Sequence, residues 1–411
     1  MDNIEKDVKL NKGQNLDWRF FIVTIVLVSF GLIMVYSSSS VEASTSSSYN
    51  YNGYYFFIRQ MRGVLLGFTG IFIITRLRLE FIKKMSLPFV LLSIILLALV
   101  LFIGVERNGS KRWLELAGFS LQPSELCKLS LVLFMSSYLS ESKKKVKSFW
   151  LGVFPLLFLV GIIFLLIEMQ PDLGTIIAIG LIFMFMLYIA GTRAFHLISI
   201  FIIGLGIGIF QVIEKPYRMA RMMSFVNPWK DPESSGFQII QSLLALGSGG
   251  LWGMGIGQSR QKLFYLPEQH TDFIFAIIGE ELGFAGCLFT IMLFLIFIYS
   301  GFRIALSRKD SFSFLLAAGL TGSIAIQAFV NMSVASGLLP LTGMTLPFIS
   351  FGSTSMIVSL CSVGLVLKIS ASPPLKEPER REVKLEKSLR KISREKTYNK
   401  GYIQDYKEYI F

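Results

Sequence analysis

One carboxylate of the sequence stands where it could do chemistry. Asp272 opens a long apolar run, directly after the polar segment LPEQHT (266–271). A carboxylate at the boundary between water and lipid is a functional candidate by default, and it could take a proton from an attacking hydroxyl. The structural alternative is that Thr271 or Asp272 caps the N-terminus of the helix that follows. His270 is expected to be a hydrogen-bonding neighbour rather than a metal ligand.

Basic residues in two polar segments could hold an anion beside this carboxylate. Arg218 and Arg221 are three residues apart, so on a helix they would share one face and could grip a diphosphate. Lys111 and Arg112 lie in the other segment. In glycosyl transfer from a lipid-linked sugar diphosphate, the leaving group is already an anion, so one base and several cations suffice. The alternative is that a long loop exports positive charge without holding any ligand.

Other ionisable residues lie in or beside apolar runs, where an uncompensated charge is costly. Glu125 and Lys128 are three residues apart, so they either neutralise each other or contact a substrate. Asp172 begins an apolar run and is equally well explained as a carboxylate at the positive end of a helix dipole. Glu280 is expected on the side of its helix that carries the boundary carboxylate, with Glu281 turned away.

The composition indicates the class of protein that must position these residues. Of 411 residues, 53% are hydrophobic and 16% are charged, and the mean hydropathy is +0.60. A soluble globular chain carries about 25% charged residues. The composition therefore excludes a soluble enzyme and a disordered chain and indicates a polytopic membrane protein. Two histidines and three cysteines, the latter within apolar runs, argue against a zinc centre and a disulfide framework.

The apolar runs predict an all-α bundle of ten transmembrane helices, because a span needs about 20 apolar residues and no alternation of barrel length is present. The predicted spans are 18–38, 58–75, 84–104, 124–140, 150–168, 172–191, 194–213, 272–300, 312–335 and 346–368. The membrane domain is thus 18–368, with a large loop at 214–271. Residues 1–17 have no signal-peptide pattern, so the first span is expected to direct export. The serine-rich stretch 37–48 is expected to be a flexible outer loop.

Lysine and arginine in the loops predict the orientation. Basic residues gather at 76–84, 143–147, 193 and 303–309, whereas 39–55, 169–171 and 336–345 have none. The first set is therefore expected to be cytoplasmic, together with both termini and the basic tail 369–411. The loops 105–123 and 214–271 are basic and yet fall on the outer side, which is why they are candidates for anion binding.

The long loop also contains a glycine-rich segment. Residues 247–257 read GSGGLWGMGIG and lack the spacing of a dinucleotide-binding loop. Tight turns and close approach of the backbone are the expected reason for these glycines, and an oxyanion cradle is only weakly indicated. Lys230 and Lys262 have no basic companion at helical spacing, so each is expected to tolerate replacement by alanine.

Five motifs in order resemble the SEDS (shape, elongation, division and sporulation) family, closer to its FtsW/SpoVE branch than to its RodA branch. The resemblance covers nearly the whole chain from the first span to the last. The motifs are GSKRWLELAGFSLQPSELCK (109–128), QPDLGT (170–175), NPWKDPESSGFQIIQSLLALGSGG (227–250), LPEQHTDFIFAIIGEELG (266–283) and GLLPLTGMTLPFISFGSTS (337–355).

The resemblance implies a ten-span peptidoglycan glycosyltransferase that polymerises lipid II on the outer face of the bacterial cytoplasmic membrane during division or sporulation. It implies inverting transfer with release of undecaprenyl diphosphate, and it identifies Asp272 as the essential acid of the family's HTDF motif. The residues expected to support the site are Gln122, Ser124, Gln170, Asp172, His270 and Glu280. This sequence departs from the family's SYGGS motif at 350–354, which reads SFGST and puts a role of that loop in doubt.

The resemblance also implies a class B penicillin-binding protein as transpeptidase partner, with other division proteins and no nucleic acid. A requirement for a divalent cation such as Mg²⁺ is left open. Two other functions compete: a lipid II flippase or other transporter, and a non-catalytic division scaffold. A transporter should need charges at mid-membrane, whereas most candidates here lie at the outer boundary, and a scaffold has little use for Asp272.

Overall fold

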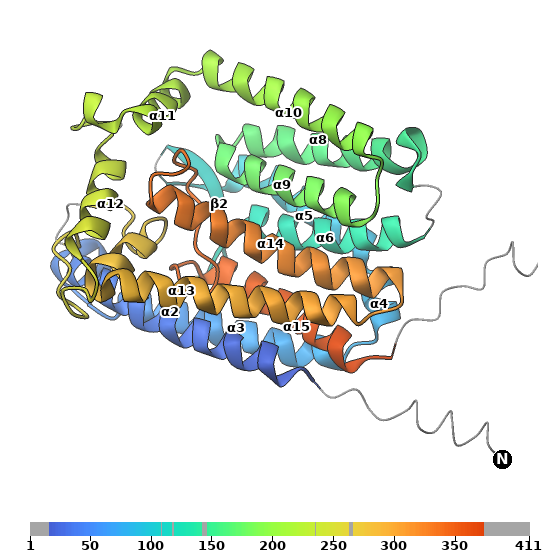
Figure 1. The fold of residues 1–411 in the computed structure, drawn as a ribbon, viewed down its shortest axis with the longest axis horizontal. Helices are drawn as coiled ribbons and strands as arrows, with labels where there is room; N and C mark the ends of the chain where they lie inside the picture. The colour runs from blue at the N-terminus through green and yellow to red at the C-terminus, as the bar shows by residue number, and fades with distance from the viewer. Residues whose placement is uncertain are drawn as a thin grey trace, which may run out of the picture. The chain divides into compact units, whose positions relative to one another are not determined.

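The described part of the chain is a bundle of long apolar helices (Figure 1). The computed structural model describes residues 16–107, 109–116, 119–141, 146–234, 236–262 and 266–373. Nearly all of the predicted N-terminal segment, residues 143–145 of the basic 143–147 cluster, and the tail from 374 lie outside these ranges. The predicted all-α membrane fold is confirmed.

Each predicted span coincides with a helix in these ranges. The long helices are α2 (Trp18–Thr45), α3 (Tyr55–Arg76), α5 (Ser86–Ile103), α6 (Pro123–Ser140), α8 (Phe154–Glu168), α9 (Leu173–Ile189), α10 (Ala194–Glu214), α13 (Ile274–Leu306), α14 (Ser311–Ala335) and α15 (Ser353–Ala371). A π-helical turn, η2 (Phe149–Val153), precedes α8. Within the described residues, eight helices are long and apolar enough to cross a membrane; α6, with its polar first turn, and the shorter α9 are not among them. The count of ten spans therefore stays a prediction.

Short elements connect the long helices. They are η1 (Ser47–Tyr49), α4 (Leu79–Lys84), α11 (Pro216–Val226), η3 (Pro228–Lys230) and α12 (Phe237–Ser248). The last three lie in the predicted outer loop, so much of that loop is helical. None of the residues of α10 is buried, and the helix lies at the edge of the bundle, where it contacts α9 and α11 (Figure 1).

The serine-rich stretch after residue 37 is not a flexible loop, because α2 continues to Thr45. Its hydroxyl groups donate to carbonyl groups three or four residues earlier on the same helix, as Ser39 does to Val35 at 2.6 Å. These bonds satisfy the hydroxyls inside the helix, which is compatible with a membrane helix although serine has a low helix propensity. Ser37 is buried and donates to Glu281 on α13 at 2.6 Å.

Two other helix ends differ from the sequence prediction. The last helix begins at Ser353 rather than at 346, because 346–352 forms turns in which Phe348 has a positive φ of 65°. Helix α13 extends to Leu306 rather than 300. The first difference places 346–352 in the connector between α14 and α15, beside the segment that contains Asp272.

The loop 105–123 contains a small antiparallel sheet that the sequence did not predict. Strands β1 (Val105–Arg107), β2 (Ser110–Leu116) and β3 (Phe119–Leu121) pair in that order. The sheet contacts α5 and α6 through β2 and α15 through β3. Strand β2 thereby fixes the place of Lys111 and Arg112.

Helix α13 is broken in its N-terminal third, and the glycine-rich loop fills the break. Gly283 has φ 68° and ψ −166°, which interrupts the ladder of helical hydrogen bonds. Four backbone bonds join the two segments: Met254 to Glu280 at 3.0 Å, Gly255 to Glu281 at 2.9 Å, Phe284 to Gly250 at 2.8 Å, and Ala285 to Leu251 at 3.1 Å. A Cβ atom on Gly253 would lie 2.2 Å from the carbonyl oxygen of Glu281. Close approach of the backbone, as expected, explains these glycines.

Candidate active site

Asp272 lies two residues before α13, on the segment that enters this helix. The residue is partly exposed, and its carboxyl group faces the connector between α14 and α15, where a Cβ atom on Gly343 would lie 3.7 Å from Oδ2. Burial, together with the nearby carboxylates of Glu268 and Asp172, raises the pKa of Asp272 to about 7, although His270 and Arg221 act in the opposite direction. Such a carboxyl group can exchange a proton near neutral pH, as a general base must.

The capping alternative for this residue is wrong. The N-cap of α13 is Phe273, and no side chain in the described structure caps that end. The backbone N–H groups of Thr271, Asp272 and Phe273 all turn back to the carbonyl oxygen of Glu268, at 3.1, 3.1 and 3.3 Å. Glu268 itself has a positive φ of 54°. The carboxylate of Asp272 is therefore not engaged with the helix end that follows it.

Asp172 is engaged with a helix end, as its structural alternative predicted. It caps α9, where it accepts hydrogen bonds from the N–H of Thr175 at 3.1 Å and from its hydroxyl at 2.8 Å. Arg112 lies beside it, with Nη1 at 3.7 Å from Oδ2 of Asp172. The same guanidinium group donates to the carbonyl groups of Gln170, at 3.1 Å, and Pro171. Arg112 thus braces the turn that places a second carboxylate near Asp272.

The two arginines of the predicted diphosphate grip both lie on α11 but have different surroundings. Arg218 is 3% exposed, and its Nη2 lies 2.8 and 3.0 Å from the two carboxylate oxygens of Glu168. Lys215 also contacts Glu168, at 2.7 Å. Arg221 is exposed and is close enough to Asp272 to lower its pKa. Arg221 therefore acts electrostatically on Asp272, whereas Arg218 is paired with the Glu168 carboxylate.

Sequence reasoning missed Glu168. It is the last residue of α8 and the only acidic residue of that helix, whereas the chain shortly after α10 is basic. An acidic residue at the end of an otherwise apolar run was a signal that could have been used. Because its carboxylate accepts both cations, it anchors α11 to the end of α8.

The pair at the start of α6 is an ion pair in the structure. Lys128 Nζ lies 2.8 Å from Glu125 Oε1, and both residues are buried. Gln122 precedes the helix, and its N–H donates to the hydroxyl of Thr354 on α15 at 3.2 Å. Ser124 is buried in the first turn. These residues lie together at the junction of α6 and α15, and Lys111 lies exposed on β2.

His270 lies between aromatic rings next to the acidic segment. Its ring centroid is 4.3 Å from that of Phe56 and 5.7 Å from that of Phe351. Its Nδ1 is 3.5 Å from Oε2 of Glu42 on α2, an ion pair when the imidazole is protonated. Glu42 was not singled out in the sequence, because it falls within the stretch that was read as a loop.

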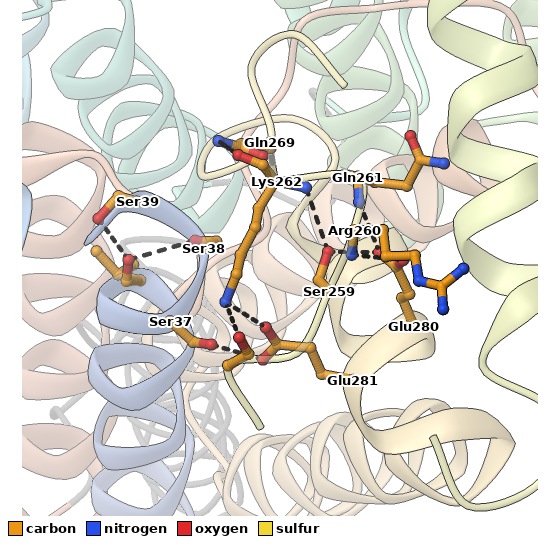
Figure 2. Close-up of polar contacts among 12 residues, drawn as sticks. Ser37, Ser38, Ser39, Ser259, Arg260, Gln261, Lys262, Gln269, Glu280 and Glu281 are labelled. Atoms are coloured by element: carbon orange, nitrogen blue, oxygen red, sulfur yellow. Dashed lines mark hydrogen bonds and ion pairs between the residues drawn. The ribbon is translucent and has the colours of Figure 1, made fainter. Parts of the chain in front are cut away.

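Glu280 and Glu281 are both buried, and both bind the loop that precedes the Asp272 segment (Figure 2). Glu280 accepts hydrogen bonds from the hydroxyl of Ser259, from the N–H of Arg260 at 2.9 Å and from that of Gln261 at 3.4 Å. This arrangement engages the Glu280 carboxylate with the loop, so its contacts place it there rather than beside Asp272.

Lys262, which was expected to tolerate alanine better than the two arginines, is buried and ion-paired. It is 5% exposed, its Nζ lies 3.4 Å from Glu281 Oε1, and it also donates to the carbonyl of Gly257 (Figure 2). Its carbonyl oxygen accepts a hydrogen bond from Gln269 at 3.3 Å. The sequence interpretation failed because the partner of Lys262 lies on α13, beyond the reach of helical spacing.

The acidic and imidazole groups of the site do not form an evident metal centre. Among the described residues, no three histidine, cysteine, aspartate or glutamate side chains are placed to hold an ion together. The buried carboxylates of Glu125 and Glu281 are each paired with a lysine, Lys128 and Lys262 respectively.

Comparisons with known proteins agree with this architecture. The family model described as "Cell cycle protein", for FtsW, RodA and SpoVE, matches residues 17–373. Stage V sporulation protein E of Bacillus subtilis (strain 168) is 43% identical over 363 residues, which is 87% of this chain and 98% of that protein. A probable peptidoglycan glycosyltransferase FtsW of Geobacter sp. (strain M18) is 39% identical over 363 residues, covering 88% and 98%.

Solved structures are also similar. A chain in the structure described as "Structural coordination of polymerization and crosslinking by a peptidoglycan synthase complex" matches with a TM-score of 0.71 at 28% identity, covering 86% of this chain and 97% of that one. The rod shape determining protein RodA of Thermus thermophilus matches with a TM-score of 0.63 at 27% identity, covering 86% and 96%.

Proposed function

Because the chain belongs to the FtsW/RodA/SpoVE family of cell cycle proteins, we propose that it is a peptidoglycan glycosyltransferase that polymerises lipid II at the outer face of the cytoplasmic membrane. The name of the Geobacter relative and the description of the similar synthase complex support this activity. The membrane-embedded bundle suits a reaction whose donor and acceptor both carry lipid chains.

The observation that carries the proposal is the carboxyl group of Asp272, which faces the connector between α14 and α15 and whose pKa of about 7 suits a base at neutral pH. In the reaction, a hydroxyl oxygen of the acceptor sugar attacks the anomeric carbon of the donor and forms the new glycosidic bond. Asp272 takes the hydroxyl proton. The bond between the anomeric carbon and the phosphate oxygen breaks, and undecaprenyl diphosphate leaves with the electron pair. Attack opposite the leaving group inverts the anomeric configuration.

Arg221 is the cation that we assign first to the donor diphosphate. It is exposed and acts electrostatically on Asp272, so an anion beside it would lie next to the base. Arg218 and Lys215 share one carboxylate, that of Glu168, and therefore leave one net positive charge on this group, one turn from Arg221 along α11. Preorganised cations of this kind stabilise the charge that develops on the leaving group. Lys111 and Arg112 on β2 are assigned to the edge of the same site.

The partner and the location extend this proposal. A class B penicillin-binding protein would cross-link the strands, in line with the coupled polymerization and crosslinking of the similar complex. Both termini are assigned to the cytoplasm by the positive-inside pattern of the loops. Work at the division septum, with other division proteins, is the assignment that the FtsW and SpoVE relatives favour.

The test is polymerisation of labelled lipid II by the purified full-length protein, with glycan chains separated on a gel. Asp272→Asn keeps the size of the side chain but removes the base, and loss of a general base typically lowers the rate about 10²- to 10⁴-fold. Glu233→Gln, an exposed acid of the outer segment, is the matched control. Chains from the wild type and the control but not from Asp272→Asn support the proposal. Transport of lipid II without chains would indicate a flippase, and neither activity would indicate a scaffold.

A further inference from the structure

The connector between α14 and α15 binds the Asp272 segment along its backbone. Three successive carbonyl groups, those of residues 270–272, each accept a hydrogen bond from it or from the end of α14. The N–H of Phe351 donates to the first at 2.8 Å. The hydroxyl of Ser350 donates to the second. The side-chain amide of Asn331 donates to the third, the carbonyl of Asp272 itself, at 2.8 Å.

These bonds fix the Asp272 segment through its carbonyl groups, which have no partner within the turn that begins at Glu268 among the bonds of the described residues. The N–H groups of residues 271–273 already point back to Glu268, so the carbonyl groups are the remaining backbone contacts. With both sets bound, the direction of the Asp272 side chain is set by two separate pieces of the chain. Asn331 is 1% exposed and Ser350 is 5% exposed, so water cannot easily replace either donor.

The two donors are themselves held in place. The amide of Asn331 also donates to the carbonyl of Met344 at 2.6 Å, which links α14 to the connector. The Ser350 hydroxyl accepts a hydrogen bond from the N–H of Leu346 at 2.8 Å. Gln60 on α3 binds the backbone of the connector twice. Its side-chain N–H donates to the carbonyl of Ser350 at 3.0 Å, and its side-chain oxygen accepts from the N–H of Gly352 at 3.1 Å. The donors therefore belong to a rigid frame formed by α3, α14 and the connector.

The frame is compatible with the departure from the family motif at 350–354. The groups that reach residues 270–272 are a serine hydroxyl and a main-chain N–H. Neither requires the tyrosine hydroxyl or the second glycine that this sequence lacks. The ring of Phe351 instead packs against His270 and Phe56.

We propose that Asn331 and Ser350 are positioning residues that hold Asp272 in its working orientation by binding the carbonyl groups of its segment. This inference rests on the proposed function. It assigns no proton transfer to either residue, since they act on the backbone of the segment and Asp272 acts on the substrate. A displacement of a catalytic group by about 1 Å can lower a rate about 100-fold, so loss of either donor is expected to act on turnover rather than on binding.

The test compares Ser350→Ala, Ser350→Thr, Asn331→Leu and Asn331→Ala in the full-length protein, with kcat and KM for lipid II polymerisation measured at several pH values. We expect kcat to fall about 10- to 100-fold in the variants that lose the donor, with KM changed less than about threefold. Ser350→Thr keeps the hydroxyl and should recover most of the rate. Ser362→Ala, whose hydroxyl bonds only the carbonyl of Val358 in its own helix among the described residues, is the control.

A second readout separates positioning from general loss of structure. Burial is the main reason for the high pKa of Asp272, so a loosened segment should hydrate the carboxyl group and move the acid limb of kcat to lower pH. Unchanged kcat and an unchanged acid limb in Asn331→Leu and Ser350→Ala would overturn the inference, as would equal loss in Ser350→Thr at an unchanged melting temperature. Failure of the wild type to polymerise lipid II would instead overturn the proposed function.

Discussion

Lys262 and Glu281 form a buried ion pair between the loop that leads to Asp272 and the helix that follows it. Nζ of the lysine and Oε1 of the glutamate are 3.4 Å apart. The hydroxyl of Ser37 donates to the other carboxylate oxygen at 2.6 Å, so three segments of the chain meet at Glu281 (Figure 2). Removing one member of such a pair leaves an uncompensated charge, whereas removing both does not.

Lys262→Met is therefore expected to destabilise the protein by about 3–5 kcal/mol, the usual cost of breaking a buried pair. The double variant Lys262→Met/Glu281→Gln should be milder, because no charge remains and the amide can still accept from Ser37. The melting temperature of the purified full-length protein measures both effects. Arg260→Met is the control, since the side chain of Arg260 is exposed and only its N–H binds Glu280. Equal melting temperatures for the single variant and the wild type would contradict this prediction.

The rate of polymerisation should rise with pH through about 7, because only the deprotonated form of Asp272 can act as a base. Glu268→Gln and Asp172→Asn each remove a carboxylate that raises this pKa, so the midpoint of the acid limb should move to lower pH. Arg221→Ala removes a cation that lowers the pKa, so the midpoint should move to higher pH. Plots of kcat against pH check the sign of each shift.

Asparagine is chosen at position 172 because it can still cap α9. Glu233→Gln changes a charge on the same outer segment at an exposed position and should leave the midpoint in place. If the three midpoints coincide with that of the wild type, a group other than Asp272 controls the acid limb.

Arg218 and Arg221 should respond differently to replacement. Arg218→Ala leaves Glu168 with one cation fewer and is expected to lower stability by about 1.5–3 kcal/mol, as loss of a hydrogen bond to a charged group does. The additional change Glu168→Gln should restore part of the lost melting temperature. Arg221→Ala should raise KM for lipid II with little change in melting temperature, because its side chain is exposed. A similar rise in KM for both variants, with the melting temperature of Arg218→Ala unchanged, would contradict this prediction and favour the two-arginine grip.

The sequence predicted the elements of this fold better than the contacts between them. Long apolar runs give the helices directly, because burial in lipid requires about 20 apolar residues wherever a span occurs. The continuation of α2 to Thr45 was missed because serine favours loops in water, whereas here its hydroxyls bond within the helix. Asp272 was found from its position at the start of an apolar run. Asn331 and Ser350 were not found from the sequence, because they bind the Asp272 segment from positions dozens of residues away along the chain.

Ion pairs could likewise be predicted from the sequence only where both residues lie on one helix. The Glu125–Lys128 pair was recognised because three residues on one helix fix its geometry. Glu168 with Arg218, and Lys262 with Glu281, pair across turns and loops, where spacing along the chain carries no geometric information. A basic residue without a companion at helical spacing is therefore no safe control for an experiment on this loop.

The glycine-rich loop in the break of α13 also bears on the permeability of the membrane. An interrupted helix exposes peptide groups that would otherwise draw water into the hydrocarbon region. Here the N–H groups of Phe284 and Ala285 and the carbonyl groups of Glu280 and Glu281 are all bonded to residues 250–255 of the same chain. These peptide groups therefore need no water molecules as partners. A protein of this family can thus handle a charged headgroup beside this helix while the bilayer remains a barrier to ions and protons.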